Sequence, residues 1–243
     1  MGVSVNTDAP YLFKINFYLN QFLDNEETFM RRRRKKGADE KLLSYENYVI
    51  KNNIELLKGK WKKRFNNENP IHAEFGTGRG KFITTLAKQN PDINYIAMEI
   101  KEEVLLKAVE KAAEDNLSNI LFVWGDVSNI LDYFDKGELD RVFVNFCDPW
   151  PKKRWAKRRL THSNFLEMYK IILKENGELH FKTDNEKLFE FSLNEIASNN
   201  WLLINISLDL SNSDYTENVT TEYEDKFMSQ GIKIFRCEAE KRN

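Results

Sequence analysis

The sequence predicts an α/β protein built on a mostly parallel β-sheet. From residue 71 onward, short apolar runs alternate with segments whose apolar residues recur at helical spacing, which is typical of βαβ units. The chain has 243 residues, 41% of them hydrophobic, so it can fill the core of one large domain. We expect a single domain over 30–243, with a basic segment at 30–70, a core at 71–243, and an extension of unknown role at 1–29.

Seven apolar runs predict the strands of this sheet. The first, "IHAEF", ends at a phenylalanine before a glycine, and the fourth, "DRVFVNF", ends two residues before the acid Asp148. In chain order, the expected strands cover 71–75, 94–98, 119–124, 140–146, 177–183, 201–210 and 231–240.

Four segments between these runs are expected to be helices, because the apolar residues of such a segment fall on one face at a period of 3.6 residues. In 101–115 the opposite face is charged. The expected helices cover 80–89, 101–115, 163–174 and 185–198. The apolar stripes of the first three consist of Phe82, Ile83, Leu86 and Ala87; Val104, Leu105, Ala108 and Ala112; and Phe165, Leu166, Tyr169, Ile172 and Leu173.

Positive charge is concentrated in two runs. The chain has 37 basic and 38 acidic residues, which argues against a protein whose whole surface is positive, such as a histone. However, "RRRRKK" at 31–36 and "KKRWAKRR" at 152–159 are almost wholly basic. A single run of this kind is a solvated surface as often as it is a binding site. Two runs favour a polyanionic partner, because neutralising phosphates requires clustered cations. Met30 stands just before the first run, and it is open whether Met30 is the true start.

Membrane and metal functions are not indicated. The longest apolar runs are far shorter than a membrane-spanning helix requires. The two cysteines, Cys147 and Cys237, cannot form a disulfide framework, and no CxxC or Cys/His cluster predicts a zinc site. These features favour a cytoplasmic protein without a metal.

A glycine-rich loop follows the first expected strand, in "EFGTGRGK". Gly76, Gly78 and Gly80 permit a tight turn and a close approach of backbone to a ligand at a helix N-terminus. The dinucleotide fingerprint GxGxxG requires a glycine at its sixth position, where this sequence has Lys81, so the pattern does not fit an NAD site.

An acid stands at or near the end of each of the first four expected strands. These acids are Glu74, Glu99, Asp126 and Asp148. The carboxyl ends of parallel strands meet at one edge of the sheet, where α/β proteins bind ligands. Singly, each acid would more often cap a turn, but four in register with a glycine loop predict a binding site. Glu99 is placed to accept ribose hydroxyls, and Asp126 to accept from an adenine amine.

This series resembles the class I S-adenosylmethionine-dependent methyltransferases. That resemblance implies a Rossmann-like fold with a seven-stranded, mostly parallel sheet, an antiparallel last strand and helices on both faces. A cofactor with a sulfonium cation and no phosphates also suits a pocket of acids, which would repel a pyrophosphate.

"DPWPKKRWAKRRL" at 148–160 resembles the signature of the bacterial tRNA (guanine-N7)-methyltransferases, and "FKTDN" at 181–185 and "TTEYEDKFMSQG" at 220–231 resemble two further motifs of that family. The likeness extends from about Met30 to the C-terminus. It implies methyl transfer from S-adenosylmethionine to N7 of a guanine in tRNA, at position 46 in the variable loop. The family usually has a histidine where this chain has Trp155, and often a serine or proline at Cys147.

The resemblance also assigns roles to residues. Glu74, Gly76, Gly78, Gly80, Glu99, Asp126 and Asp148 would bind the cofactor or shape its pocket. Substrate contacts would come from Lys152, Asp184, Thr221, Glu222, Tyr223 and Glu224. The phosphates of the RNA would be contacted by Lys153, Arg154, Lys157, Arg158 and Arg159, and by the run at 31–36.

Guanine N7 has an in-plane lone pair, so its methylation needs alignment and charge stabilisation rather than a general base. Asp148 is the expected catalytic residue and Asp184 the second candidate. Trp150 or Trp155 is expected either to stack on a base or to support the loop. Cys147 is expected to be a packed thiol rather than a covalent nucleophile.

Three alternatives remain at this stage. A methyltransferase of the same fold could act on another nucleic-acid nitrogen, although the second proline of "DPWP" is displaced from the amino-methyltransferase motif. A non-catalytic RNA-binding relative should lack glycines or acids that are present here. A nucleotide-dependent oxidoreductase is disfavoured by Lys81. The sequence leaves open whether the protein is a monomer or a homodimer, and which tRNAs it prefers.

Overall fold

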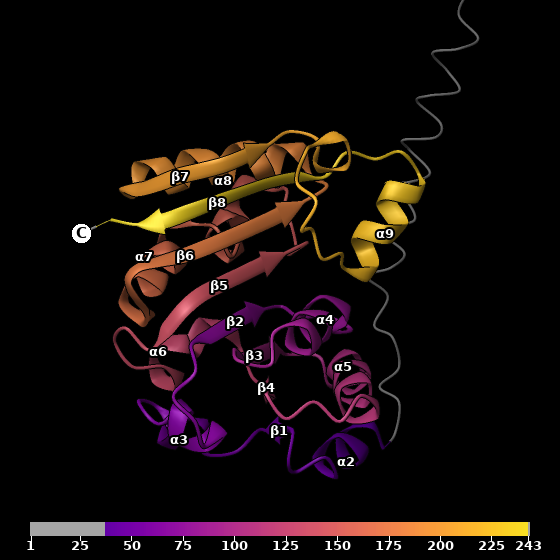
Figure 1. The fold of residues 1–243 in the computed structure, drawn as a ribbon. Helices are drawn as coiled ribbons and strands as arrows, with labels where there is room; N and C mark the ends of the chain where they lie inside the picture. The colour runs from indigo at the N-terminus through magenta and orange to yellow at the C-terminus, as the bar shows by residue number, and fades with distance from the viewer. Residues whose placement is uncertain (1–36, 243) are drawn as a thin grey trace, which may run out of the picture. The chain divides into compact units, whose positions relative to one another are not determined.

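The computed structural model describes residues 37–242. The expected extension at 1–29, Met30 and the basic run at 31–36 lie outside the described residues. The described part forms an eight-stranded sheet with helices on both of its faces, which confirms the predicted α/β class (Figure 1). No helix in this part has the length and apolar character needed to cross a membrane.

The elements alternate along most of the chain. The strands are β1 (Val49–Ile50), β2 (Ile71–Phe75), β3 (Asn94–Glu99), β4 (Ile120–Trp124), β5 (Leu139–Asn145), β6 (Leu173–Thr183), β7 (Trp201–Ser207) and β8 (Phe235–Lys241). The α-helices are α2 (Ala38–Leu43), α3 (Trp61–Phe65), α4 (Lys81–Gln89), α5 (Glu102–Glu114), α6 (Ile130–Tyr133), α7 (Ser163–Ile172), α8 (Glu186–Ser198) and α9 (Glu222–Ser229). Short 3₁₀ helices are η1 (Ile54–Leu57), η2 (Val127–Asn129), η3 (Lys153–Arg158) and η4 (Leu210–Asn212).

The strand order determines where a ligand can bind. The sheet runs β1-β4-β3-β2-β5-β6-β8-β7, and β8 alone runs antiparallel to the other strands. The order reverses between β2 and β5, which is the switch point at which open α/β sheets bind ligands. The arrowheads of β2, β5 and β6 point to the edge at which α9 lies (Figure 1). The expected antiparallel last strand is therefore confirmed.

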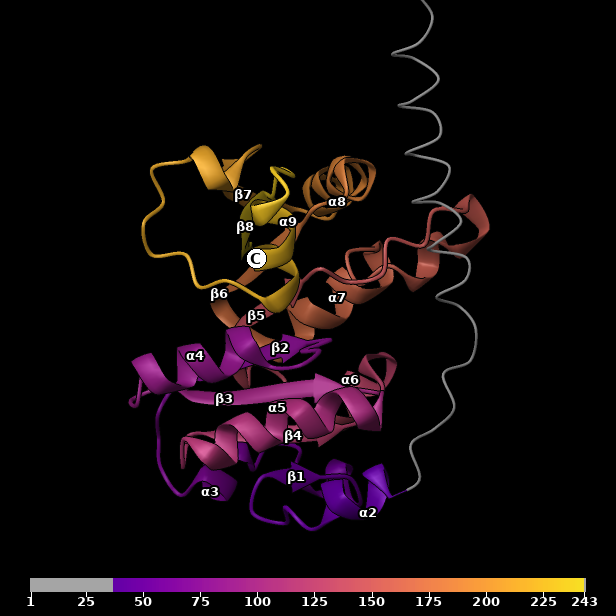
Figure 2. The same cartoon turned by 90° about the vertical axis from the view of Figure 1, so that its right-hand side faces the viewer.

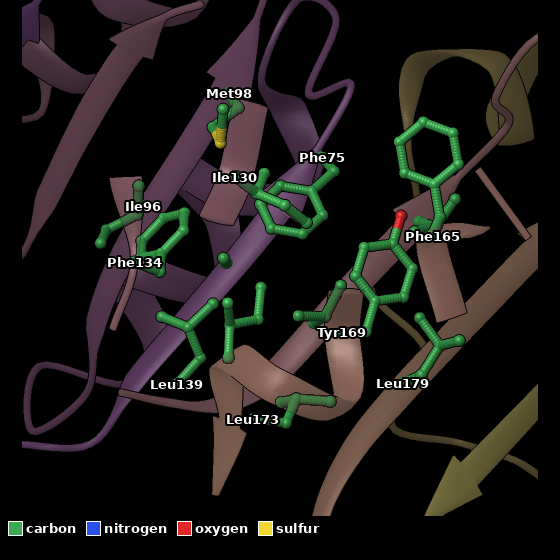
Figure 3. Close-up of a cluster of buried hydrophobic side chains, with 14 of the residues drawn as sticks. Phe75, Ile96, Met98, Ile130, Phe134, Leu139, Phe165, Tyr169, Leu173 and Leu179 are labelled. Atoms are coloured by element: carbon green, nitrogen blue, oxygen red, sulfur yellow. The ribbon is translucent and has the colours of Figure 1, made fainter. Parts of the chain in front are cut away.

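Two apolar clusters hold the helices against the sheet. The larger lies between the strands and α3, α6, α7 and α8, where Phe75 stacks on Tyr169 with ring centroids 5.6 Å apart (Figure 3). The smaller packs α2, α4 and α5 on the other face. Viewed from the ligand edge, α4 lies on one side of the sheet and α7 and α8 on the other (Figure 2). Both faces are thus covered, as a parallel sheet requires.

Several element boundaries differ from those predicted. Leu173, expected in a helix, begins β6 and pairs with Leu139. The register then shifts across a segment that contains Asn176, whose φ is 58°, and pairing resumes between Arg141 and Glu178. The strand expected at 201–210 ends at Ser207, because Leu210 turns inward and begins η4. The last strand begins at Phe235 rather than at 231. The eighth strand, β1, and helices α2, α3, α6 and α9 were not predicted.

Candidate active site

The glycine loop, residues 76–80, joins β2 to α4 at the switch point. Gly76 and Gly78 have positive φ angles of 82° and 59°, and a Cβ at either position would meet no atom within 4 Å. The amide of Gly76 donates to the carbonyl of Met98 at 2.9 Å, and that of Gly78 to Glu99 Oε2 at 3.2 Å. The loop therefore presents bare backbone beside open space at the ligand edge, which permits close approach of a ligand.

Gly80 has a different role from the other two glycines. Its φ is +81°, and a Cβ there would lie 2.4 Å from the Cβ of Ala108 on α5. The glycine thus permits the N-terminus of α4 to pack against α5. Lys81, which replaces the glycine of the dinucleotide pattern, extends its Nζ to Thr220 Oγ1 at 2.8 Å and forms an ion pair with Asp225.

Glu74 supports the glycine loop from inside the protein. It is only 1% exposed, and its carboxyl oxygens accept from Thr77 Oγ1 at 2.6 Å and from Asn145 Nδ2 at 2.9 Å. Burial raises the pKa of Glu74 to about 7. Glu74 therefore connects the loop to the end of β5, and its position fits the pocket-shaping role that the sequence allowed.

Glu99 and Asp126 end adjacent strands at the same edge. Glu99 is half-buried, and its Oε1 accepts from the amides of Ile100 and Lys101 at 2.9 and 3.0 Å. Asp126 is exposed, and its Oδ1 caps η2 by accepting from the amide of Ser128 at 2.8 Å. Both carboxylates thus organise a turn, as acids at strand ends commonly do, and both stand where the sequence placed ligand contacts.

The basic loop, residues 146–160, follows β5. It turns through Phe146 and Trp150, whose φ angles are 49° and 42°, and the amide of Phe146 donates to the carbonyl of Lys182 at 2.9 Å. Asp148 is exposed in this loop. Burial and then the nearby Asp148 carboxylate raise the pKa of the Cys147 thiol to about 12.

Asp184, the second candidate for catalysis, lies near the same place. It follows the end of β6 and is half-buried. Burial raises the pKa of its carboxyl group above the ordinary value. Its charge also acts on the Cys147 thiol, in the same direction as that of Asp148. Asp148 and Asp184, which follow two adjacent strands, therefore both act electrostatically on one thiol.

The cations of the basic loop form two groups. Five are exposed: Lys152, Lys153, Arg154, Lys157 and Arg158. Arg159 instead turns inward, donating to the carbonyls of Pro149 and Trp150 at 3.0 Å each while its guanidinium lies 4.2 Å from the centroid of Phe191. The exposed group is available to a polyanion, whereas Arg159 stabilises the loop itself.

Trp150 and Trp155 pack edge to face, with centroids 5.8 Å apart, and both are half-buried. Arg158 lies over the ring of Trp150 at 4.9 Å, and Lys152 over that of Trp155 at the same distance. This arrangement supports the loop, which was one of the two roles expected for these tryptophans.

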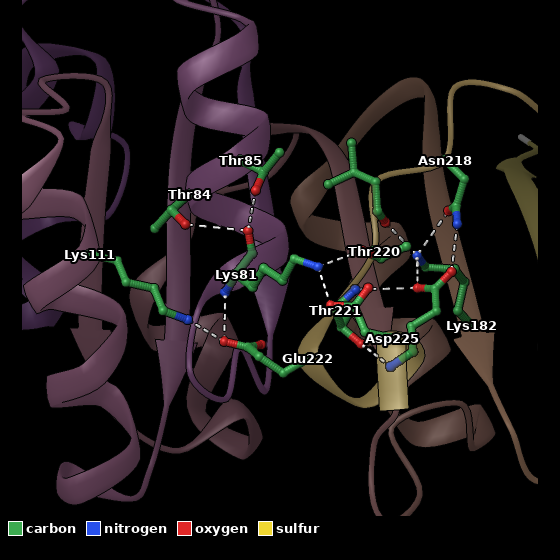
Figure 4. Close-up of polar contacts among 12 residues, drawn as sticks. Lys81, Thr84, Thr85, Lys111, Lys182, Asn218, Thr220, Thr221, Glu222 and Asp225 are labelled. Atoms are coloured by element: carbon green, nitrogen blue, oxygen red, sulfur yellow. Dashed lines mark hydrogen bonds and ion pairs between the residues drawn. The ribbon is translucent and has the colours of Figure 1, made fainter. Parts of the chain in front are cut away.

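Helix α9 brings the last predicted group to the edge. Thr221 caps the helix in a capping box with Glu224, whose fully buried carboxylate pairs with Lys182 Nζ at 2.6 Å. Glu222 accepts from the amide of Lys81 at 3.3 Å and pairs with Lys111 (Figure 4). These three side chains hold α9 in place.

Tyr223 differs from its neighbours because it is 57% exposed. Its ring stacks on Phe146 and on Phe227, with centroids 6.4 and 6.3 Å away. Of the four residues predicted from 221–224, Tyr223 thus presents the most surface, and it does so beside the first residue of the basic loop.

Two residues of this site, Asn145 and Lys182, were not predicted from the sequence. They pair in register on β5 and β6, and each donates to a buried carboxylate. The available signal was a polar residue inside an otherwise apolar strand, in "VFVNF" and "LHFKT". Such residues are buried only when a partner satisfies them.

Comparison with known proteins gives one family and several relatives. A family model described as "Putative methyltransferase" matches residues 68–237. The tRNA (guanine-N(7)-)-methyltransferase of Clostridioides difficile (strain 630) is 78% identical over 214 residues, which are 88% of this chain and 100% of that protein. The enzyme of the same name from Streptococcus pneumoniae (strain 70585) is 52% identical over 211 residues, 87% of this chain and 100% of that protein.

Solved structures show the same fold at low identity. The 16S rRNA methyltransferase KamB superposes with a TM-score of 0.60 at 13% identity, over 76% of this chain and 94% of that one. An antibiotic-related methyltransferase gives a TM-score of 0.57 at 17% identity, over 76% and 94%. These likenesses concern the fold alone.

Proposed function

The chain belongs to the tRNA (guanine-N7)-methyltransferase family, and from this premise we propose that it transfers a methyl group from S-adenosylmethionine to N7 of a guanine in tRNA. The observation that carries the proposal is 78% identity over the whole length of a relative with that name. The site supports it, because an open glycine loop and strand-end carboxylates meet at the switch point of the sheet.

The residues present fit S-adenosylmethionine. Gly76 and Gly78 leave open space next to the backbone, and Glu99 and Asp126 end the two strands beyond β2. We assign the cofactor to this edge of the sheet, with Glu74 supporting the glycine loop from inside the protein. When bound, the cofactor supplies an electrophilic methyl group on a sulfonium cation. Carboxylates around it favour that charge, whereas they would oppose a pyrophosphate.

Asp148 is proposed as the catalytic residue. N7 of guanine already has a lone pair, so the protein must align the base and stabilise the positive charge that develops on it. Asp148 is exposed at the carboxyl end of β5, and its carboxylate can accept from the base or stabilise that charge. Asp184 is the second candidate, because it follows the adjacent strand β6 and its charge acts on the same thiol as that of Asp148.

Tyr223 offers a stacking face for the guanine. The 57% exposed ring lies against Phe146, two residues before Asp148. Stacking on an aromatic ring contributes roughly 1–3 kcal/mol per base. A base displaced from the RNA stack would therefore have an aromatic surface and a carboxylate on neighbouring segments.

The exposed cations of the basic loop are proposed to bind the phosphates of tRNA. Lys153, Arg154, Lys157 and Arg158 are all exposed in the loop that carries Asp148. The likeness of the "DPWPKKR" motif supports guanine 46 of the variable loop as the target. The reaction as proposed takes place in the cytoplasm, requires neither metal nor membrane, and is compatible with a monomer or a homodimer.

The decisive experiment uses unmodified tRNA and labelled S-adenosylmethionine. Nucleoside analysis should find the label in 7-methylguanosine, and borohydride followed by aniline should cut the RNA at one site, position 46. Label found only in N2-methylguanosine or N6-methyladenosine would contradict the N7 assignment and favour another nitrogen as target.

A further inference from the structure

Lys182 is a buried cation at the end of β6. It is 5% exposed, and its Nζ donates to Glu224 Oε2 at 2.6 Å, to the carbonyl of Val219 at 2.8 Å, and to Asn218 Oδ1 at 3.2 Å. All three acceptors belong to the segment that ends in the first turn of α9. Lysine is rarely buried unless it is paired, and here every partner comes from the segment that leads into α9.

The other side of the ion pair is equally enclosed. Glu224 is 0% exposed, and its second oxygen accepts from Asn218 Nδ2 at 2.6 Å. The same carboxylate completes the capping box with Thr221. The pair therefore determines both the start of α9 and the path of the chain that leads to it.

The backbone of Lys182 contacts the second loop of the site. Its carbonyl accepts from the amide of Phe146 at 2.9 Å, at the start of the basic loop that carries Asp148. Lys182 also pairs in register with Asn145, which donates to Glu74 under the glycine loop. One residue thus contacts the loop of Asp148 through its backbone and the helix of Tyr223 through its side chain.

The Lys182–Glu224 pair bears on where the ring of Tyr223 lies relative to Asp148, a separation that matters for the reaction. Tyr223 is the neighbour of Glu224 in α9, and its ring stacks on Phe146. Without the ion pair, the first turn of α9 would lose the contact that holds it against β6. The stacking face of Tyr223 would then shift relative to Asp148 while both residues remained present.

We propose that Lys182 is a positioning residue for methyl transfer: through Glu224 it fixes the aromatic face of α9 relative to the Asp148 loop, and so aligns the guanine with the methyl donor. The inference rests on the proposed function. Misplacement of a reacting group by about 1 Å can lower a rate by roughly 100-fold. Loss of Lys182 should therefore affect turnover far more than binding.

The test compares Lys182→Met with the double variant Lys182→Met/Glu224→Gln. The single variant leaves a buried carboxylate unpaired, so its melting temperature should fall; the double variant removes that charge and should recover much of the stability. In both, kcat for tRNA methylation should fall about 100-fold. The dissociation constants for S-adenosylmethionine and for tRNA should change less than about threefold, because the phosphate and cofactor contacts remain.

Lys174→Met is the matched control. Lys174 lies on the same strand and is also ion-paired, with Asp140 at 2.6 Å, but it is 39% exposed and its contacts lie outside the site. Its kcat should equal that of the wild type. Wild-type protein that makes no 7-methylguanosine would refute the proposed function and not the role of Lys182 in particular.

Two results would overturn the inference. One is a kcat within threefold of wild type in Lys182→Met. The other is recovery of kcat together with melting temperature in the double variant, which would mean that Lys182 acts only on stability. Should the single variant not fold, the kcat of the double variant decides. Should neither variant fold, Lys182 is a folding residue and the positioning role is rejected.

Discussion

Arg159 donates from its Nε to the carbonyl oxygen of Pro149 at 3.0 Å, so a cation of the basic run holds the turn that follows Asp148. Its Nη2 also donates to the carbonyl of Trp150. Arg158, the preceding residue, is exposed. Adjacent arginines in one basic run therefore differ in their surroundings: Arg159 binds the backbone of its own loop, whereas Arg158 faces solvent. Cations of these two kinds should respond differently to substitution.

Removal of Lys153 and Lys157 should weaken tRNA binding in proportion to lost phosphate contacts. In Lys153→Ala/Lys157→Ala, the slope of log Kd against log salt should decrease by roughly 1.4–1.8, because each of two phosphate contacts contributes about 0.7–0.9. Filter binding at several salt concentrations measures this slope. Lys88→Ala, which removes an exposed lysine of α4, should leave it unchanged.

Arg159→Ala should behave differently. Because its guanidinium organises the loop, the substitution should lower kcat by about tenfold or more while the salt slope stays at the wild-type value. Arg159→Lys should not restore activity, since one ammonium cannot reproduce the paired donors and the planar contact with Phe191. A slope that flattens as in the lysine double variant would show that Arg159 contacts phosphate, as the sequence alone suggested.

Asp148→Asn should reduce turnover strongly and tRNA affinity little. The substitution keeps the size of the side chain but removes the charge that would stabilise methylated guanine, so we expect kcat to fall about 100-fold or more. Single-turnover rates and binding constants for the same tRNA separate the two effects. Asp184→Asn is the comparison and should cost less. Unchanged turnover in Asp148→Asn would remove Asp148 from the catalytic role.

The sequence predicted the site's location better than the tasks of its residues. Apolar runs that end near acids predicted the edge at which Glu99, Asp126 and Asp148 lie, because parallel strands necessarily bring their carboxyl ends together. The local sequence pattern around Glu224 could not show that this residue is buried, because its partner Lys182 is 42 residues away in the sequence. Nor could helical spacing show that Leu173 belongs to a strand, because its pairing with Leu139 is a tertiary contact.

The glycines of the loop should separate binding from stability. Gly80→Ala would force a Cβ to 2.4 Å from that of Ala108 and should cost about 2 kcal/mol or more of unfolding free energy. Gly78→Ala meets no atom within 4 Å, so only its left-handed backbone costs stability, about 1 kcal/mol. Its methyl group would instead enter the space proposed for the cofactor.

Calorimetric titration with S-adenosylmethionine and thermal unfolding measure these two effects. Gly78→Ala should weaken cofactor binding at least tenfold with a small change in melting temperature, whereas Gly80→Ala should mainly lower the melting temperature. Equal cofactor affinity in Gly78→Ala and the wild type would place the cofactor elsewhere.

Cys147 should be dispensable for chemistry. A thiol whose pKa is raised to about 12 is protonated at neutral pH and is a poor nucleophile. Cys147→Ala should keep activity within about threefold, and native protein at pH 8 should resist iodoacetamide, because the pKa of Cys237 is also raised to about 12. Rapid alkylation with loss of activity, or a trapped covalent complex with RNA, would contradict this expectation.

Glu74 should make the unfolding free energy depend on pH. Its pKa is about 7 in the folded protein and 4.5 in the reference state, so the folded form binds a proton that the unfolded form releases between these values. Its contribution to stability is therefore fully present below pH 4.5 and is lost as pH rises through 7.

Glu74→Gln keeps groups that can hydrogen-bond Thr77 and Asn145 but does not titrate. Relative to this variant, the wild type should lose roughly 3 kcal/mol between pH 4.5 and pH 8. Denaturant unfolding of both proteins without cofactor measures the difference, and Glu190→Gln, at an exposed position on α8, should follow the wild type. Parallel curves for wild type and Glu74→Gln would show that the buried carboxyl group stays ionised.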